Sequence, residues 1–266
     1  MIIMSKLKIA LLPKLLQNVH KAQKKWRQTN YETSIKEFQN EIEQILEILN
    51  YYGKWNSKFK GDEIAEKMLP EIFMDGLNSL NLATFGLYKY ANMCLRSQLE
   101  TALRLIYFID HKREFGWWVN ENEWYSKSKQ YLNYVWGDDF SYFKQIENIA
   151  EFDDKTTGDK KIYSSTSSGK SGDLLKKVYG KLSKSIHTSA QHFQTSTGKF
   201  SPKYSKPKME DWIKTCKDVQ CFIIVSVILS FPIEFKKMTQ SEQNAILTKG
   251  VVDTEYKQFI EEILKK

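Results

Sequence analysis

The chain contains few cysteines, prolines and glycines for its length. It has three Cys, five Pro and twelve Gly in 266 residues. The cysteines are odd in number, lie in apolar helical contexts and have no histidine at ligand spacing, namely Cys94, Cys216 and Cys221. This argues against a disulfide scaffold and a zinc site, and we expect reduced thiols in a cytoplasmic protein. The low Pro and Gly content argues against an all-β or linker-rich architecture.

Long apolar runs are also missing. The longest apolar stretch, residues 221–233, has 13 positions and contains Ser226, Ser230 and Pro232. It is too short to span a bilayer and predicts a buried core helix. The N-terminal residues 1–16 carry charges inside their apolar portion and no small-residue cleavage site, which is unlike a signal peptide. We therefore expect a cytoplasmic chain with no membrane partner.

Acidic residues are absent from the first 30 positions, which carry seven Lys or Arg. Residues 155–217 add fourteen lysines against four acids, and because the whole chain is +8, the remainder is net −9. Two basic segments on an acidic body can hold RNA phosphates or the acidic surface of a protein partner or second copy. In the alternative interpretation, these lysines are solvated surface residues that bind no partner.

Helical periodicity dominates the sequence and predicts an all-α bundle. In residues 32–52, apolar positions recur every three or four residues, as on the buried face of a helix. A region over 4–29 is expected to kink or restart at Pro13, and a helix opened by Asp62 is expected to be interrupted at Pro70. Further helices are predicted over 71–82, 83–111, 140–152, 173–190, 209–231 and 255–264. A loop is expected from 115, followed by a short aromatic-rich helix.

Two segments carry no helical pattern. Residues 153–172 are rich in Ser, Thr, Gly and Lys and predict a mobile basic loop, and 191–207 are irregular, with a small hairpin as an alternative. We divide the chain into an N-terminal helical region, 1–82, and a helical core with a C-terminal helical tail, 83–266. Together they are expected to form one compact unit.

The central predicted helix carries a polar stripe on an otherwise apolar sequence. Spacings of three and four place its five members on one face, namely Arg96, Glu100, Arg104, Tyr107 and His111. Charges on a buried helix are costly unless they are paired. A second stripe of the same kind, consisting of Tyr179, Ser183 and His187, is the expected partner of the first.

Arginine beside histidine is a workable set for cleaving RNA without a metal. Histidine can take the proton of a 2′-hydroxyl or supply one to the leaving 5′-oxygen, while arginine stabilises charge on the phosphate. Arg104 and His111 lie about two turns apart, some 10 Å, so Arg96 or Arg104 meeting His187 is the better geometry. The alternative is a structural lock, in which Glu100 pairs with both arginines and fixes the helix register.

The segments LRSQLETALRLIYFIDH and YGKLSKSIHTS resemble a pattern that recurs in HEPN-like helical proteins, many of them associated with prokaryotic defence or toxin–antitoxin loci. The resemblance covers about residues 83–231. It implies a helical bundle, frequent dimerisation and, in active members, metal-independent RNA cleavage by an R-x4-6-H motif. His187 matches the family histidine, whereas Lys181 stands six residues before it, where arginine is expected. Arg104 and His111, with six residues between them, also match the spacing of the R-x4-6-H motif. Inactive members of the family act as partners or regulators.

Two hypotheses follow. In the first, the chain is a HEPN-like component of a prokaryotic antiviral defence or toxin–antitoxin system and a metal-independent ribonuclease. Its reactive residues are Arg96, Arg104 and His187, oriented by Glu100, Tyr107, Tyr179 and Ser183, and RNA contacts Lys176, Lys177, Lys181 and Lys184. In the second, the chain is a non-catalytic interaction or regulatory subunit. We expect no cofactor and no metal, and RNA, a protein partner or a second copy as the binding partner.

Overall fold

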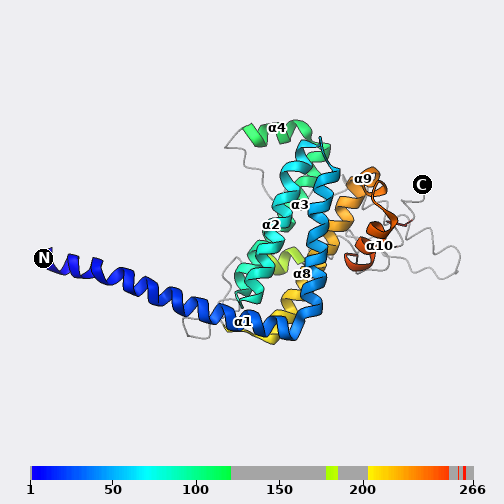
Figure 1. Cartoon of the computed structure of the whole chain (residues 1–266). Coiled ribbons are helices and arrows are strands. Elements are labelled where there is room, and N and C mark those ends of the chain that lie inside the picture. Colours follow the sequence, from blue (N-terminus) through cyan, green and yellow to red (C-terminus); the bar gives the residue numbers. More distant parts are fainter. Residues whose placement is uncertain (1, 121–177, 185–202, 252–256, 258–259, 262–266) are drawn as a thin grey trace.

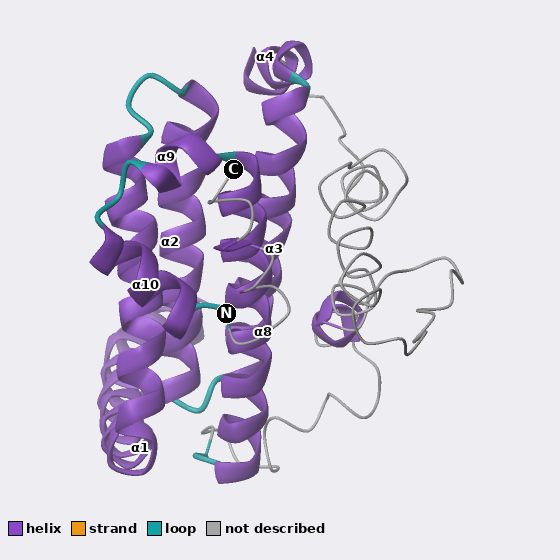
Figure 2. Cartoon of the chain, turned by 90° about the vertical axis from the view of Figure 1, so that its right-hand side faces the viewer, coloured by secondary structure: helices purple, strands orange, loops and turns teal. Residues whose placement is uncertain are grey.

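The computed structural model describes residues 2–120, 178–184, 203–251, 257, 260 and 261, with side chains of the first helix from Leu16 onward. Every element in these ranges is a helix, so the predicted all-α fold is confirmed (Figures 1 and 2). The elements are α1 (Ile2–Lys58), α2 (Glu63–Thr84), α3 (Tyr88–Asp110), α4 (Lys112–Asn120), α8 (Lys206–Ser230), α9 (Pro232–Lys236) and α10 (Gln240–Lys249), with a further helical segment at 178–184. The predictions for 140–152, 153–172 and most of 191–207 lie outside the described residues.

Helix α1 consists of two parts in different surroundings. Its first part projects away from the bundle, and its second part runs alongside the other helices (Figure 1). The backbone leaves helical angles at Phe38 (φ −134°, ψ 31°), not at Pro13 as expected. Asn30 is the first buried side chain described along this helix, and Ser34, Phe38 and Ile42 follow it into the core.

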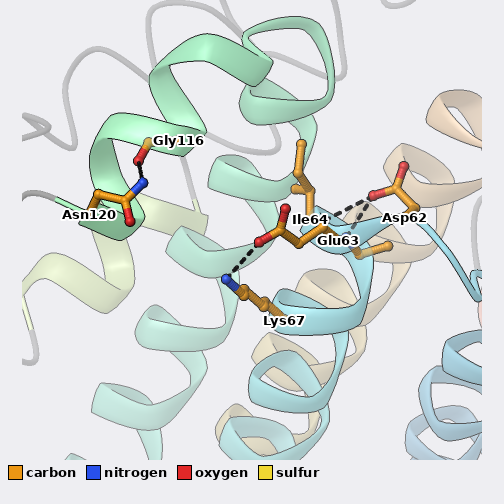
Figure 3. A network of polar contacts seen from close by, with 7 residues as sticks. Asp62, Glu63, Ile64, Lys67, Gly116 and Asn120 are labelled. Carbon is orange, nitrogen blue, oxygen red and sulfur yellow. Dashed lines mark hydrogen bonds and ion pairs between the residues drawn. The ribbon is translucent and has the colours of Figure 1, made fainter.

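Helix α2 begins where the sequence indicates. The Asp62 carboxylate accepts hydrogen bonds from the backbone N–H groups of Ile64 (3.1 Å) and Ala65 (3.0 Å), which caps the helix (Figure 3). The prediction that Pro70 interrupts the helix is wrong, because α2 continues through it to Thr84. Leu69 and Ile72 on either side of this proline are fully buried, so tertiary packing compensates for the backbone hydrogen bond that proline removes.

A tight turn separates α2 from α3, and α3 therefore starts at Tyr88 rather than at the expected position 83. Gly86 adopts φ +77°, and a Cβ there would lie 3.0 Å from Asn30 Nδ2. That amide donates to the Phe85 carbonyl oxygen at 2.9 Å. The turn thus rests directly on α1 at the point where α1 enters the bundle.

The end of α3 differs from the sequence expectation. Residues 112–120 form α4 across the end of the bundle opposite the projecting part of α1, where a loop was expected from 115 (Figure 1). Asn120 closes the last turn by donating to the Gly116 carbonyl oxygen (Figure 3).

Helix α8 contains the apolar run and confirms the prediction of a core helix, since every residue from Val219 to Leu229 is buried. No helix in the described part of the chain has both the length and the apolar content needed to cross a membrane. One hydrophobic core takes side chains from α1, α2, α3 and α8, including Trp55, Ile72, Leu99 and Ile223. Residues on both sides of position 82 share this core.

Candidate functional site

The first half of the polar stripe meets the 178–184 segment in a closed three-residue network. Arg96 Nε donates to Glu100 Oε1 at 2.8 Å, and Arg96 Nη2 donates to the Tyr179 hydroxyl at 2.9 Å. That hydroxyl in turn donates to Glu100 Oε1 at 3.0 Å. The structure therefore brings together three site residues that the sequence predicts. Tyr179 lies 79 positions after Glu100 and 83 positions after Arg96 in the sequence. We call this network the α3–Tyr179 junction.

Partial burial strengthens the junction. The side chains of Arg96 and Glu100 are 16% and 18% exposed, and the Arg96 guanidinium carbon lies 4.8 Å from the Tyr179 ring centroid. The guanidinium thus bonds a carboxylate while lying over an aromatic face, which is a favourable environment for a delocalised cation. Arg96 Nη1 is buried and has no hydrogen-bond partner among the described residues.

The surroundings of Arg96 and Tyr179 keep each of these two side chains in one protonation state. Burial by itself lowers the pKa of Arg96, but the hydrogen bond and charge of Glu100, together with Tyr179, outweigh burial and raise that pKa overall. Burial and the Glu100 charge also raise the pKa of the Tyr179 hydroxyl. Arg96 is therefore a permanent cation and Tyr179 a neutral phenol, and neither is suited to proton transfer near neutral pH.

The other residues of the second stripe have different surroundings. Ser183 Oγ donates to the Tyr179 backbone carbonyl at 2.7 Å, so its hydroxyl satisfies its own helix instead of reaching the α3 stripe. His187, the proposed reactive histidine, lies outside the described residues. Arg104 is half-buried on α3, eight positions beyond Arg96.

The far end of the α3 stripe forms a separate cluster with α4. Tyr107 OH donates to Glu114 Oε2 at 2.6 Å, whereas the sequence interpretation assigned Tyr107 to orienting the reactive groups. The His111 ring stacks on the Tyr107 ring with centroids 4.0 Å apart and planes 1° apart. His111 Nδ1 lies 2.8 Å from the Tyr107 carbonyl oxygen, and because a carbonyl only accepts, Nδ1 is assigned the hydrogen.

Of the four lysines proposed to contact RNA, two are described. Lys181 Nζ lies 2.5 Å from Asp211 Oδ1 at the start of α8, so its charge is already paired. Lys184 is exposed. Lys176 and Lys177 lie outside the described residues. The ion pair of Lys181 is a second contact that holds the 178–184 segment against the bundle.

Sequence analysis missed a fully buried polar network at the centre of the bundle. Gln220 Nε2 donates to Gln98 Oε1 at 2.7 Å, and Gln220 Oε1 accepts from Tyr52 OH at 2.7 Å. Gln98 Nε2 donates to the Ile72 carbonyl oxygen at 2.9 Å, so the network joins α1, α2, α3 and α8. Two lone glutamines inside apolar helices were the only signal in the sequence.

Other kinds of site are less well supported. Within the part of the chain that the structure describes, no three His, Cys, Asp or Glu side chains converge as a metal site requires. A shallow surface hollow of about 410 Å³ lies along α1, lined by Glu47, Asn50, Tyr51, Gly53 and Lys54. It contains none of the stripe residues.

The sequence matches no family model, and comparisons with curated proteins and with solved structures found no match either. The HEPN-like resemblance is therefore a hypothesis that rests on the motifs of the chain. The α3–Tyr179 junction is the feature around which a function can be argued.

Proposed function

We propose that the chain is a HEPN-like component of a prokaryotic antiviral defence or toxin–antitoxin system and acts as a metal-independent ribonuclease. The observation that carries the proposal is the hydrogen bond of Arg96 to Tyr179 at 2.9 Å, which joins the two polar stripes. A nuclease of this kind needs an arginine and a histidine from separate segments next to one phosphate. The junction is a partly buried point at which α3, which carries Arg104, contacts the 178–184 segment.

The sequence spacing suggests which residues react. Arg104 lies four positions beyond Glu100 on α3, about one turn from the junction, and in the sequence His187 follows Tyr179 by eight positions. Arg96 is held by hydrogen bonds to Glu100 and Tyr179, which suits a role in positioning the two segments. We therefore assign phosphate stabilisation mainly to Arg104 and proton transfer to His187.

The reaction follows from these groups. His187 takes the proton of a ribose 2′-hydroxyl, the 2′-oxygen attacks the adjacent phosphorus, and the bond from phosphorus to the 5′-oxygen breaks. The leaving 5′-oxygen accepts a proton from water, and the products are a 2′,3′-cyclic phosphate and a 5′-hydroxyl. Arginine offsets the negative charge that grows on the phosphate oxygens. Lysines of the basic segment 155–217, among them the exposed Lys184, hold the RNA backbone.

A second candidate function is supported by the same junction. Arg96 and Glu100 neutralise each other and fix the register between α3 and the 178–184 segment. Such a network is also typical of a structural lock, and the chain would then be a non-catalytic interaction or regulatory subunit. Activity separates the two functions.

The test is cleavage of labelled RNA by the purified chain in excess chelator. We expect cleavage by the wild type and its loss in His187→Ala and Arg104→Ala, while the product carries a cyclic phosphate. His20→Ala and Arg113→Ala are matched controls, because both residues are exposed and neither belongs to the α3–Tyr179 junction. Thermal unfolding of each variant separates lost chemistry from lost folding. If the wild type leaves RNA intact, the ribonuclease proposal fails and the lock interpretation stands.

A further inference from the structure

The first half of α1, residues 2–29, lies outside the bundle and is here called the α1 arm (Figure 1). Among its described side chains, none from Leu16 to Thr29 is buried. Twenty-eight residues of helix measure about 42 Å, a length comparable to the diameter of a small domain. Helices in proteins gain most of their stability from packing of an amphipathic face, so a binding surface for the arm is expected.

The arm has two chemically different sides. Leu16 and Val19 are 59% and 44% exposed and lie three positions apart, and Trp26 follows seven positions later on the same side. Lys21, Lys24 and Lys25 line the other side, around a surface hollow of about 440 Å³. Neither side contains a carboxylate, because Glu32 is the first acid of the chain.

The arm is strongly basic, because residues 1–30 carry seven Lys or Arg and no acid. Between Leu16 and Thr29 it is also amphipathic, with the apolar side and the lysine side on opposite faces of the helix.

Its chemistry distinguishes between three classes of partner. An RNA backbone uses the lysines but gains nothing from exposed leucine and valine. A second copy covers the apolar side, but two arms of charge +7 repel each other. A bilayer surface that contains anionic lipids uses both sides at once, because the headgroups attract lysine while the acyl boundary takes up the apolar side chains.

We propose that the α1 arm docks on the surface of an anionic lipid bilayer, with its axis in the plane of the membrane. Leu16, Val19 and Trp26 face the acyl boundary, and Lys21, Lys24 and Lys25 lie at the phosphate level. The arm rests on the surface without crossing it. The sequence analysis expected no membrane partner, so this surface contact is a new proposal. The proposal does not depend on RNA cleavage.

The experiment is co-sedimentation of the full chain with vesicles of phosphatidylcholine alone or mixed with phosphatidylglycerol. We expect binding only to the mixed vesicles, and weaker binding as salt is added. The triple variant Lys21→Gln/Lys24→Gln/Lys25→Gln is expected to lose on the order of a hundredfold in affinity, about fivefold for each lysine. The double variant Leu16→Gln/Val19→Gln is expected to lose about tenfold or more.

A matched control removes three exposed lysines of the bundle, as Lys60→Gln/Lys112→Gln/Lys214→Gln, and is expected to bind like the wild type. All variants should unfold at the wild-type temperature, because none of the substituted side chains belongs to the core. Absent binding to the mixed vesicles at low salt, or an equal loss in the control, overturns the proposal. Self-association and RNA affinity of the arm variants, measured in parallel, then show whether a second copy or RNA is the partner instead.

Discussion

The buried glutamine network makes the sharpest stability prediction. Gln220 is completely buried and bonds both Tyr52 and Gln98. The substitution Gln220→Leu keeps the volume but leaves the Tyr52 hydroxyl and the Gln98 carbonyl oxygen without their partner. Each unsatisfied buried group costs about 1–3 kcal/mol, so the free energy of unfolding should fall by about 2–6 kcal/mol.

The double variant Gln98→Leu/Gln220→Leu tests the reasoning further. Both ends of the central hydrogen bond are then apolar, so the double variant should lose less than the sum of the two single losses, by about 1 kcal/mol or more. Urea unfolding measures the stability of the two single variants and of the double variant. Gln39 is exposed, so the control Gln39→Leu is expected to change the free energy of unfolding by about 0.5 kcal/mol at most. A Gln220→Leu variant as stable as the wild type, or strictly additive losses, would refute this account of the core.

Three further predictions concern the junction, the thiols and the cap of α10. Glu100→Ala should lower the free energy of unfolding, measured with urea, by about 1–3 kcal/mol, because it leaves the largely buried Arg96 cation without its carboxylate. Tyr179→Phe should lower it by less. Equal losses in the two variants would count against the junction. Burial raises the pKa of the Cys216 thiol to about 12, so a thiol reagent should modify the half-buried Cys94 first and Cys216 only on unfolding. Hydrogen bonds from Thr239 lower the pKa of Glu242 below its ordinary 4.5, so the stability that Glu242→Ala loses at neutral pH should shrink as the pH falls below 4.5. A difference that does not change with pH, down to the lowest pH at which the wild type stays folded, would contradict this prediction.

Local patterns were sufficient to predict the helical fold and the polar stripe on α3. The apolar run of α8, the cap at Asp62 and the stripe on α3 are each set by residues within a few turns of one another, and helical periodicity reports such relations directly. The all-α fold follows from them. The partner of Arg96 was also inferable, because a second polar stripe of matching type stands at Tyr179.

Long-range contacts were not predictable in the same way. Gln98 and Gln220 lie 122 positions apart, and nothing near either glutamine indicates that the other is its partner. Tyr107 bonds Glu114 because α4 changes direction after α3. The aromatic sequence of residues 112–120 does not predict this change of direction. Pro70 stays within α2 because the packing of its neighbours outweighs the local rule.

The charge pattern predicted the basic segments but not how individual lysines are used. Lys181 was expected to face RNA, yet it pairs with Asp211, thirty positions away on another helix. A sequence shows the number of charges in a segment, whereas pairing depends on which surfaces meet in the fold. The α1 arm keeps its lysines exposed because no element of the described bundle packs against it.

Cleavage of labelled RNA in excess chelator, compared between the wild type and His187→Ala, tests the central claim most directly. We predict that the wild type cuts the RNA and leaves a 2′,3′-cyclic phosphate, and that a folded His187→Ala variant does not. Intact RNA with the wild type, or equal cleavage by both proteins, would contradict the proposal that the α3–Tyr179 junction frames a ribonuclease site.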